Sequence, residues 1–159
     1  MTIAATVPLA AVLVWLAIVD FRELRLPDSG TLALLIVGLL YRATVAQPLW
    51  IFVFGALLGY LSFWSIAEVY LRQTGTPGLG LGDAKLMAAV GAWLGPLGLG
   101  PVVAASALLA LSFICVLRMI GRPIGPGQQV AFGPFIATAF LGVWCIAYLP
   151  FDGVQSWTF

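Results

Sequence analysis

The first 21 residues, Met1–Phe21, read MTIAATVPLAAVLVWLAIVDF and contain a single charged side chain, that of Asp20. An α-helix needs about 20 predominantly apolar residues to cross the hydrocarbon core of a bilayer. The segment lacks the basic residues that begin a signal peptide, and its apolar run is longer than the core of such a peptide. We therefore expect a retained transmembrane helix here, with a carboxylate near its end.

The whole chain shares this apolar character. Of its 159 residues, 62% are apolar and 8% are charged, and the mean hydropathy is +1.10. Soluble domains contain about 25% charged residues, so most of the surface of the folded chain must face lipid. The net charge of +1 gives no reason to expect a nucleic-acid partner. Histidine is absent, which excludes Ser-His and Cys-His catalysis and histidine-ligated metals. We expect neither a metal nor a cofactor, and we expect Cys115 and Cys145 to be small buried apolar residues.

Six apolar windows in the sequence are long enough to predict membrane spans. The expected fold class is all-α, a polytopic membrane protein formed by one domain over residues 1–159 and built as a bundle of six transmembrane helices. Pro48 and Pro101 are expected to mark turns or helix ends. The windows are Ile3–Phe21, Thr31–Ala46, Leu49–Leu71, Ala84–Leu99, Val102–Ile120 and Phe132–Leu149.

The basic residues predict the orientation of the chain. If six spans alternate in direction, all basic residues except Arg42 fall on one side of the membrane. Loops rich in lysine and arginine face the cytoplasm, so both termini are expected to lie outside. The basic residues on the predicted cytoplasmic side are Arg22, Arg25, Arg72, Lys85, Arg118 and Arg122.

Two carboxylates fall at the same predicted membrane edge. Asp20 lies near the end of the first span and Asp83 lies at the start of the fourth, and ionisable groups at membrane depth suggest function. Each also has an ordinary alternative: Asp20 as an interfacial partner of Arg22 or Arg25, and Asp83 as a helix cap. Together they can form the one hydrolytic site available to this chain without histidine. Such a site is a pair of carboxyl groups that share a proton and activate water. As a hypothesis, the dipole at a helix N-terminus makes Asp83 the base-like partner and Asp20 the acid-like one.

The other acidic residues have simpler interpretations. Asp28 is expected to be a turn or cap residue leading into the second span. Glu23 and Glu68 are expected to form exposed pairs with Arg25 and Arg72.

A glycine-dense stretch, Thr74–Leu86 or TGTPGLGLGDAKL, leads into the fourth span. Gly80 and Gly82 have no Cβ, so their backbone can approach a substrate closely and adopt positive φ. Such a segment can also offer strand-like hydrogen bonds to an extended peptide. Lys85 is expected to favour the anionic form of Asp83. A phosphate-binding loop is disfavoured because the sequence lacks GK[ST], whereas a flexible connector remains open as an alternative.

Three motifs in order resemble those of type IV prepilin peptidases. Gly80–Asp83 is a GxGD motif, Asp20–Asp28 reads DFRELRLPD, and Phe132–Phe135 reads FGPF. The resemblance implies a six-span aspartic endopeptidase of the bacterial inner membrane. It implies that Asp20 and Asp83 are catalytic, with Gly80, Gly82 and Lys85 in supporting roles. The implied substrates are type IV prepilins or pseudopilins, whose basic leader is removed at the cytoplasmic face of the membrane.

The chain also departs from that family. Many bacterial members carry an N-terminal zinc-binding region that accompanies N-methylation, and it has no counterpart before Asp20. The resemblance therefore implies a peptidase without methyltransferase. Ala131 stands where many members have proline. Two further interpretations stay open: an ion-coupled transporter that uses the same carboxylates, which predicts broken helices repeated in two halves, and a non-enzymatic membrane scaffold.

Overall fold

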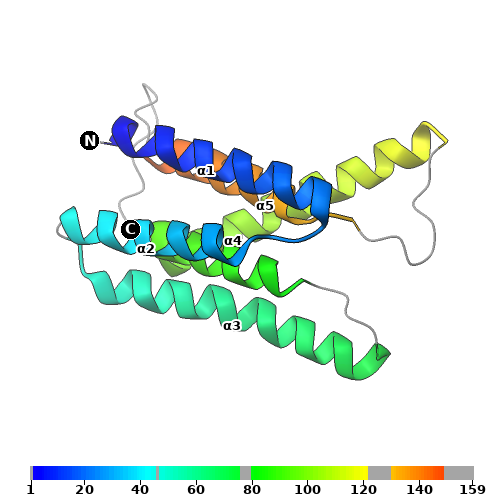
Figure 1. The fold of residues 1–159 in the computed structure, drawn as a ribbon, viewed down its shortest axis with the longest axis horizontal. Helices are drawn as coiled ribbons and strands as arrows, with labels where there is room; N and C mark the ends of the chain where they lie inside the picture. Colours follow the sequence, from blue (N-terminus) through cyan, green and yellow to red (C-terminus); the bar gives the residue numbers. More distant parts are fainter. Residues whose placement is uncertain (1, 46, 76–79, 122–129, 149–159) are drawn as a thin grey trace.

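The computed structural model describes residues 2–45, 47–75, 80–121 and 130–148, and these residues form a bundle of helices without strands. The all-α prediction is confirmed. Figure 1 shows the arrangement. The helices are α1 (Thr2–Glu23), α2 (Asp28–Thr44), α3 (Leu49–Thr74), α4 (Leu81–Met119) and α5 (Gly133–Tyr148).

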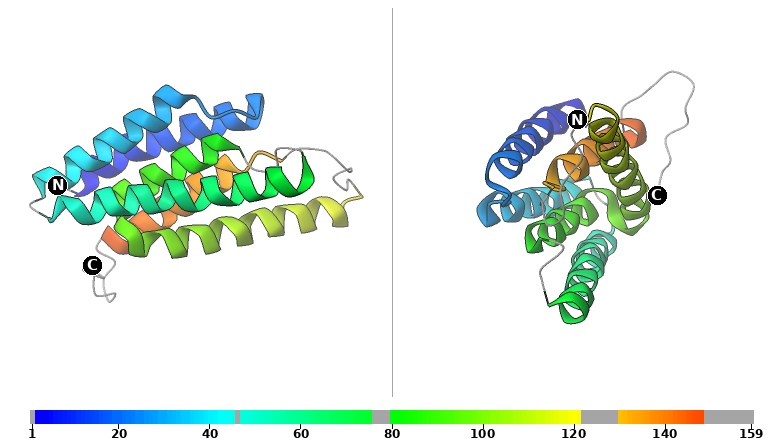
Figure 2. Two further views of the ribbon diagram at one scale, coloured as in Figure 1. Left: turned by 90° about the horizontal axis from the view of Figure 1, so that it is seen from below. Right: turned by 90° about the vertical axis from the view of Figure 1, so that its right-hand side faces the viewer.

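The six predicted windows correspond to five helices rather than six. The windows Ala84–Leu99 and Val102–Ile120 both lie within α4, where Gly95 alone has non-helical dihedral angles, φ 73° and ψ −178°. Glycine adopts positive φ at little cost, and the two parts of α4 on either side of Gly95 run in opposite directions (Figure 2). The predicted break at Pro101 is wrong, because α4 turns at Gly95 and remains helical through Pro101. The six-span count stays a prediction.

Three of the helices are long and apolar enough to cross a membrane, namely α1, α3 and α4. The 39 residues of α4 would span about 58 Å as one straight helix. That length is roughly twice the ~30 Å thickness of the hydrocarbon core. The reversal at Gly95 therefore lets both parts of α4 occupy the same bilayer.

Small residues bring α3 and α4 into close contact. A Cβ atom on Gly55 would lie 2.7 Å from the carbonyl oxygen of Gly91, and one on Gly59 would overlap the carbonyl of Met87. Close backbone approach at small residues is a usual way for helices to associate in lipid. Gly55, Gly59 and Gly91 thus serve packing within the bundle.

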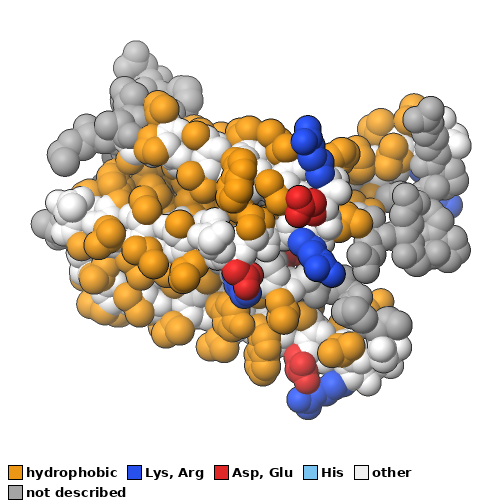
Figure 3. Space-filling model, viewed as in Figure 1, with side chains coloured by type: hydrophobic (Ala, Val, Ile, Leu, Met, Phe, Trp, Pro, Cys, Tyr) orange, Lys and Arg blue, Asp and Glu red, His pale blue; other side chains and the backbone are white. Residues whose placement is uncertain are grey.

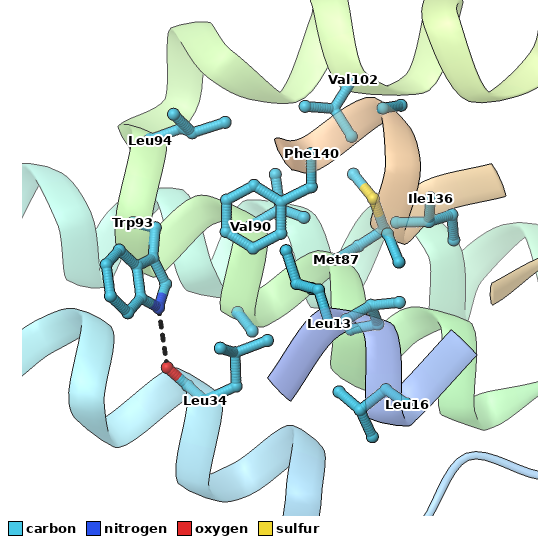
Figure 4. Close-up of a cluster of buried hydrophobic side chains, with 14 of the residues drawn as sticks. Leu13, Leu16, Leu34, Met87, Val90, Trp93, Leu94, Val102, Ile136 and Phe140 are labelled. Atoms are coloured by element: carbon cyan, nitrogen blue, oxygen red, sulfur yellow. Dashed lines mark hydrogen bonds between the residues drawn. The ribbon is translucent and has the colours of Figure 1, made fainter. Parts of the chain in front are cut away.

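The core lies where α1, α2, α4 and α5 meet (Figure 4). Leu13 and Leu16 of α1 pack there with Val90 of α4 and Phe140 of α5. The Nε1–H of Trp93, buried in the same cluster, donates to the carbonyl oxygen of Leu34 at 2.8 Å. The expectation that both cysteines are buried is wrong, because Cys115 is exposed and Cys145, which packs against the core, is only half-buried.

Charged side chains gather at one end of the bundle, which we call the charged end. There α1, α3 and α4 finish and α2, α4 and α5 begin (Figure 1). The last turns of α1, α3 and α4 carry Arg22, Arg72 and Arg118. On the face shown in Figure 3, apolar side chains are spread over the rest of the described helices. Arg42 lies in the last turn of α2, at the opposite end. Arg122 lies outside the described residues.

Candidate active site

Asp20 and Asp83 lie near each other at the charged end. Asp20 lies in the last turn of α1 and Asp83 in the first turn of α4. Their side chains are 5% and 8% exposed, respectively. The two carboxyl groups are close enough to interact electrostatically, although 63 positions separate them in the sequence. The fold therefore brings the two predicted site residues together in a buried setting.

The start of α5 holds Asp20 in place. The backbone N–H of Gly133, the first residue of α5, donates to Asp20 Oδ2 at 3.0 Å. A Cβ atom at position 133 would lie 2.6 Å from the same oxygen, so only glycine fits here without a shift. The positive end of the α5 dipole also faces this carboxylate. Asp20 thus lies at a helix N-terminus as well as near the end of its own helix, which removes the basis for assigning it the acid-like role.

Asp83 belongs to the first turn of its helix. Its N–H donates to the carbonyl oxygen of Gly80 at 3.1 Å, and the Gly80 backbone in turn hydrogen-bonds the Asp83 carboxylate. A side chain at the third helical position that reaches back in this way resembles half of a capping box. The cap position that the sequence left open for Asp83 is occupied by Gly80, and Asp83 instead accepts from the Gly80 backbone while lying near Asp20.

Leu26, which belongs to the Asp20–Asp28 motif, packs against glycines of the GxGD and FGPF motifs. Its side chain is buried and lies against two glycines. A Cβ atom on Gly82 would lie 2.9 Å from Leu26 Cβ, and one on Gly133 would lie 3.3 Å from Leu26 Cδ1. Gly82 accordingly allows α4 to pack against Leu26. Neither Gly80 nor Gly82 has positive φ, contrary to the sequence expectation. Residues 76–79 of the glycine-dense stretch lie outside the described residues.

Comparisons with known proteins agree with the family resemblance that these three motifs indicated. The sequence model of the type IV leader peptidase family matches residues 7–118, which include both aspartates. The chain belongs to this family.

Individual relatives are similar over most of the chain. It is 40% identical over 157 residues to the prepilin leader peptidase/N-methyltransferase of Aeromonas salmonicida, an alignment that covers 98% of the chain and 52% of the relative. It is 39% identical over 132 residues to the protein of the same name from Neisseria gonorrhoeae, covering 82% of the chain and 44% of the relative. The chain thus spans about half the length of these relatives. No solved structure matches it.

In this leader peptidase family member, Lys85 pairs with Asp28. Lys85 Nζ lies 2.5 Å from Asp28 Oδ1. Asp28 is the first residue of α2, and the cap position that the sequence suggested for it is occupied by Pro27. The expected pair of Glu68 with Arg72 is present at 2.7 Å. Among the described residues, neither the pair of Glu23 with an arginine nor an ion pair of Asp20 is formed.

Arg42 is the buried charge whose environment sequence reasoning missed. Its side chain is 1% exposed, and its Nε donates to the carbonyl oxygen of Trp93 at 2.7 Å, where Nη2 also donates. Nη1 donates to Gln47 Oε1 at 3.1 Å, and the guanidinium lies 4.5 Å from the ring centre of Phe52. The available signal for this site is an arginine inside an apolar window of the sequence.

Proposed function

We propose that this chain is an aspartic endopeptidase that removes the basic leader from type IV prepilins or pseudopilins at the cytoplasmic face of the bacterial inner membrane. The observation that carries the proposal is the burial of Asp20 and Asp83 within electrostatic range of each other. The names of the relatives, prepilin leader peptidase/N-methyltransferase, support the choice of substrate. The proposal is confined to cleavage of the leader.

The pair would work by sharing one proton. Two carboxyl groups this near each other resist joint ionisation, so one is protonated while the other is an anion. The anion takes a proton from water as the water oxygen attacks the scissile carbonyl carbon, and the protonated partner donates to the carbonyl oxygen. As the tetrahedral diol collapses, one hydroxyl returns its proton to the carboxylate that had donated to the carbonyl oxygen, the C–N bond breaks, and the proton taken from water passes to the departing amine.

The surroundings of the two carboxyl groups support such a pair. Asp20 accepts from Gly133 and Asp83 accepts from Gly80, so both side chains are oriented by backbone groups at the starts of helices. Because each lies at a helix N-terminus, dipoles do not distinguish their roles. We therefore assign the acid and base functions to the pair as a unit.

The two other functions weighed from the sequence receive less support. A transporter that uses these carboxylates would place them near the middle of the membrane, beside broken helices. Here Asp20 lies in the last turn of α1 and Asp83 in the first turn of α4. The break in α4 at Gly95 lies at the opposite end of the bundle. A scaffold would not require the two carboxyl groups to meet.

The deciding experiment is co-expression with a type IV prepilin. Wild type should remove the leader, whereas Asp20→Asn and Asp83→Asn should each leave the precursor uncut at normal membrane levels. Glu68→Gln is the matched control, since it neutralises an exposed carboxylate that pairs with Arg72 instead. Cleavage by both amide variants at the wild-type rate would refute the proposed mechanism.

A further inference from the structure

A groove with a volume of about 470 Å³ lies between α2, α3 and α4. Apart from its charged end, it is apolar. On α2 it extends from Asp28 to Leu39, a separation of about 16 Å at ~1.5 Å per residue. Its larger apolar lining residues are Leu32, Leu35 and Leu39 of α2 with Val53, Leu57 and Tyr60 of α3.

The cross-section of the groove suits a helix. Three lining residues with small side chains, Thr31, Ala56 and Ala88, are buried and form the floor, whereas Leu32 and Leu57 are exposed and form the rims. Small residues let the backbone of another helix approach closely in lipid. A length of about 16 Å accommodates roughly three turns of such a helix.

One end of the groove is formed by the Asp28–Lys85 ion pair. Lys85 lies two residues after Asp83 on α4. Asp28 lies two residues after Leu26, and Leu26 packs against Gly82. The groove therefore ends within about one helical turn of Asp83. A chain leaving the groove at this end reaches the first turn of α4.

We propose that this groove receives the apolar helix of the membrane-bound precursor, with the N-terminal end of that helix at Asp28. This inference rests on the proposed function, because it positions the peptide that precedes the helix beside Asp20 and Asp83. The substrate enters sideways from the lipid, and the bond to be cut lies just beyond the end of the groove.

The charges at the end of the groove favour a peptide over an anionic lipid. The ion pair has no net charge, and the Asp28 side chain is 75% exposed whereas that of Lys85 is 37% exposed. The groove thus presents a carboxylate rather than an ammonium group. A carboxylate attracts the positive end of a helix dipole and a basic leader, and it repels a lipid phosphate.

Photo-crosslinking tests the occupant directly. A photoreactive residue replaces Leu57 in the full-length protein carrying Asp20→Asn, which holds the precursor uncut, and the probe is a type IV prepilin in the same membrane vesicles. The matched control is position 58, an exposed leucine on another face of α3: Leu58 is 42% exposed and Leu57 is 56% exposed. Position 57 should give at least about ten times more prepilin adduct than position 58, as a preference of about 1.4 kcal/mol for the groove would produce.

Kinetics provides a second measurement in the wild-type background. Leu57→Trp should fill the groove and raise the apparent KM for the membrane precursor about tenfold, equivalent to about 1.4 kcal/mol. Its kcat should be unchanged, because the carboxyl pair is untouched. Leu58→Trp should change neither constant.

The two proposals fail in different ways. If wild type cleaves the prepilin but position 57 gives adducts only with lipid, or as many prepilin adducts as position 58, the groove proposal is overturned and the proposed function stands. An unchanged KM for Leu57→Trp has the same meaning. If wild type cleaves no prepilin, the proposed function is overturned together with this inference.

Discussion

Two buried ionic sites lie at opposite ends of the same bundle, and they differ in how completely their charges are satisfied. At the far end, the Arg42 guanidinium donates to Trp93 and Gln47 and is surrounded by the rings of Tyr41, Phe52, Trp144 and Tyr148. At the charged end, two carboxyl groups that resist joint ionisation lie within electrostatic range of each other.

The Arg42 site is closed. Trp93 lies just before the turn at Gly95, where the last carbonyl groups of the first part of α4 lack helical partners. A cation at a helix C-terminus both donates to these groups and complements the dipole. The charge therefore stabilises the turn, and each of its three nitrogens already donates to a protein oxygen.

The carboxyl pair is different, because each aspartate is oriented by backbone but repelled by the other. The comparison shows that burial of a charge does not by itself indicate catalysis. What separates the two sites is whether the charge is already compensated. The following variants test that distinction, from the largest expected effect to the smallest.

Asp83→Asn should reduce leader cleavage by about 10³-fold or more, since loss of positioned acid–base chemistry costs about 10²–10⁴-fold. Thermal stability should change little, because the Oδ1 of asparagine can still accept from the Gly80 backbone and the unfavourable interaction with Asp20 is removed. Cleavage of a prepilin in vesicles and thermal unfolding in detergent measure the two effects. A variant that unfolds more readily than wild type would make Asp83 a structural residue like Arg42.

Gly133→Ala should reduce cleavage about 10²-fold, because the new Cβ would displace Asp20 and misplacement of a catalytic group by about 1 Å has that effect. The matched control on the same helix is Gly142→Ala, since a Cβ there meets nothing within 4 Å. Cleavage rates of the two purified variants give the answer. Equal activity would mean that the bond from Gly133 does not position Asp20.

Arg42→Met should destabilise the protein by about 2–3 kcal/mol, because it removes hydrogen bonds from a charged donor to buried acceptors. Arg42→Lys should recover only part of this, as a lysine cannot reproduce the planar fork of donors. Unfolding in denaturant measures the loss. Specific activity of the folded fraction should match wild type, and a loss of kcat without a loss of stability would contradict a purely structural role.

Lys85→Met should lower stability by less than about 1 kcal/mol, since the ion pair with Asp28 is partly exposed. A double-mutant cycle with Asp28→Asn separates two explanations of its effect on cleavage. If Lys85 acts through Asp28, its substitution should have no further effect once Asp28 is changed. An equal drop in kcat in both backgrounds would instead indicate direct support of Asp83.

Several features could be predicted from the sequence because they depend on local composition. Apolar windows of sufficient length predicted the helices, and the two aspartates stood out as carboxylates at the ends of apolar runs. The turn within α4 was misplaced, however. Gly95 is one of several glycines in a stretch that also contains Pro96 and Pro101, and no local pattern shows which of them adopts positive φ.

The sequence by itself determined that this chain is helical, suited to a lipid bilayer and provided with two carboxylates at helix ends. The free energy of transferring apolar side chains from water and the free-energy cost of burying a charge both depend on residue type and spacing. The i,i+4 pair of Glu68 with Arg72 was predictable from spacing, and only the tertiary structure decided the partners of charges that lie far apart in the sequence. The bond from Gly133 to Asp20 joins residues 113 positions apart, and Lys85 pairs with Asp28 across 57 positions. Such partners follow from how whole helices pack, and packing depends on close contacts between small residues that sequence spacing does not specify.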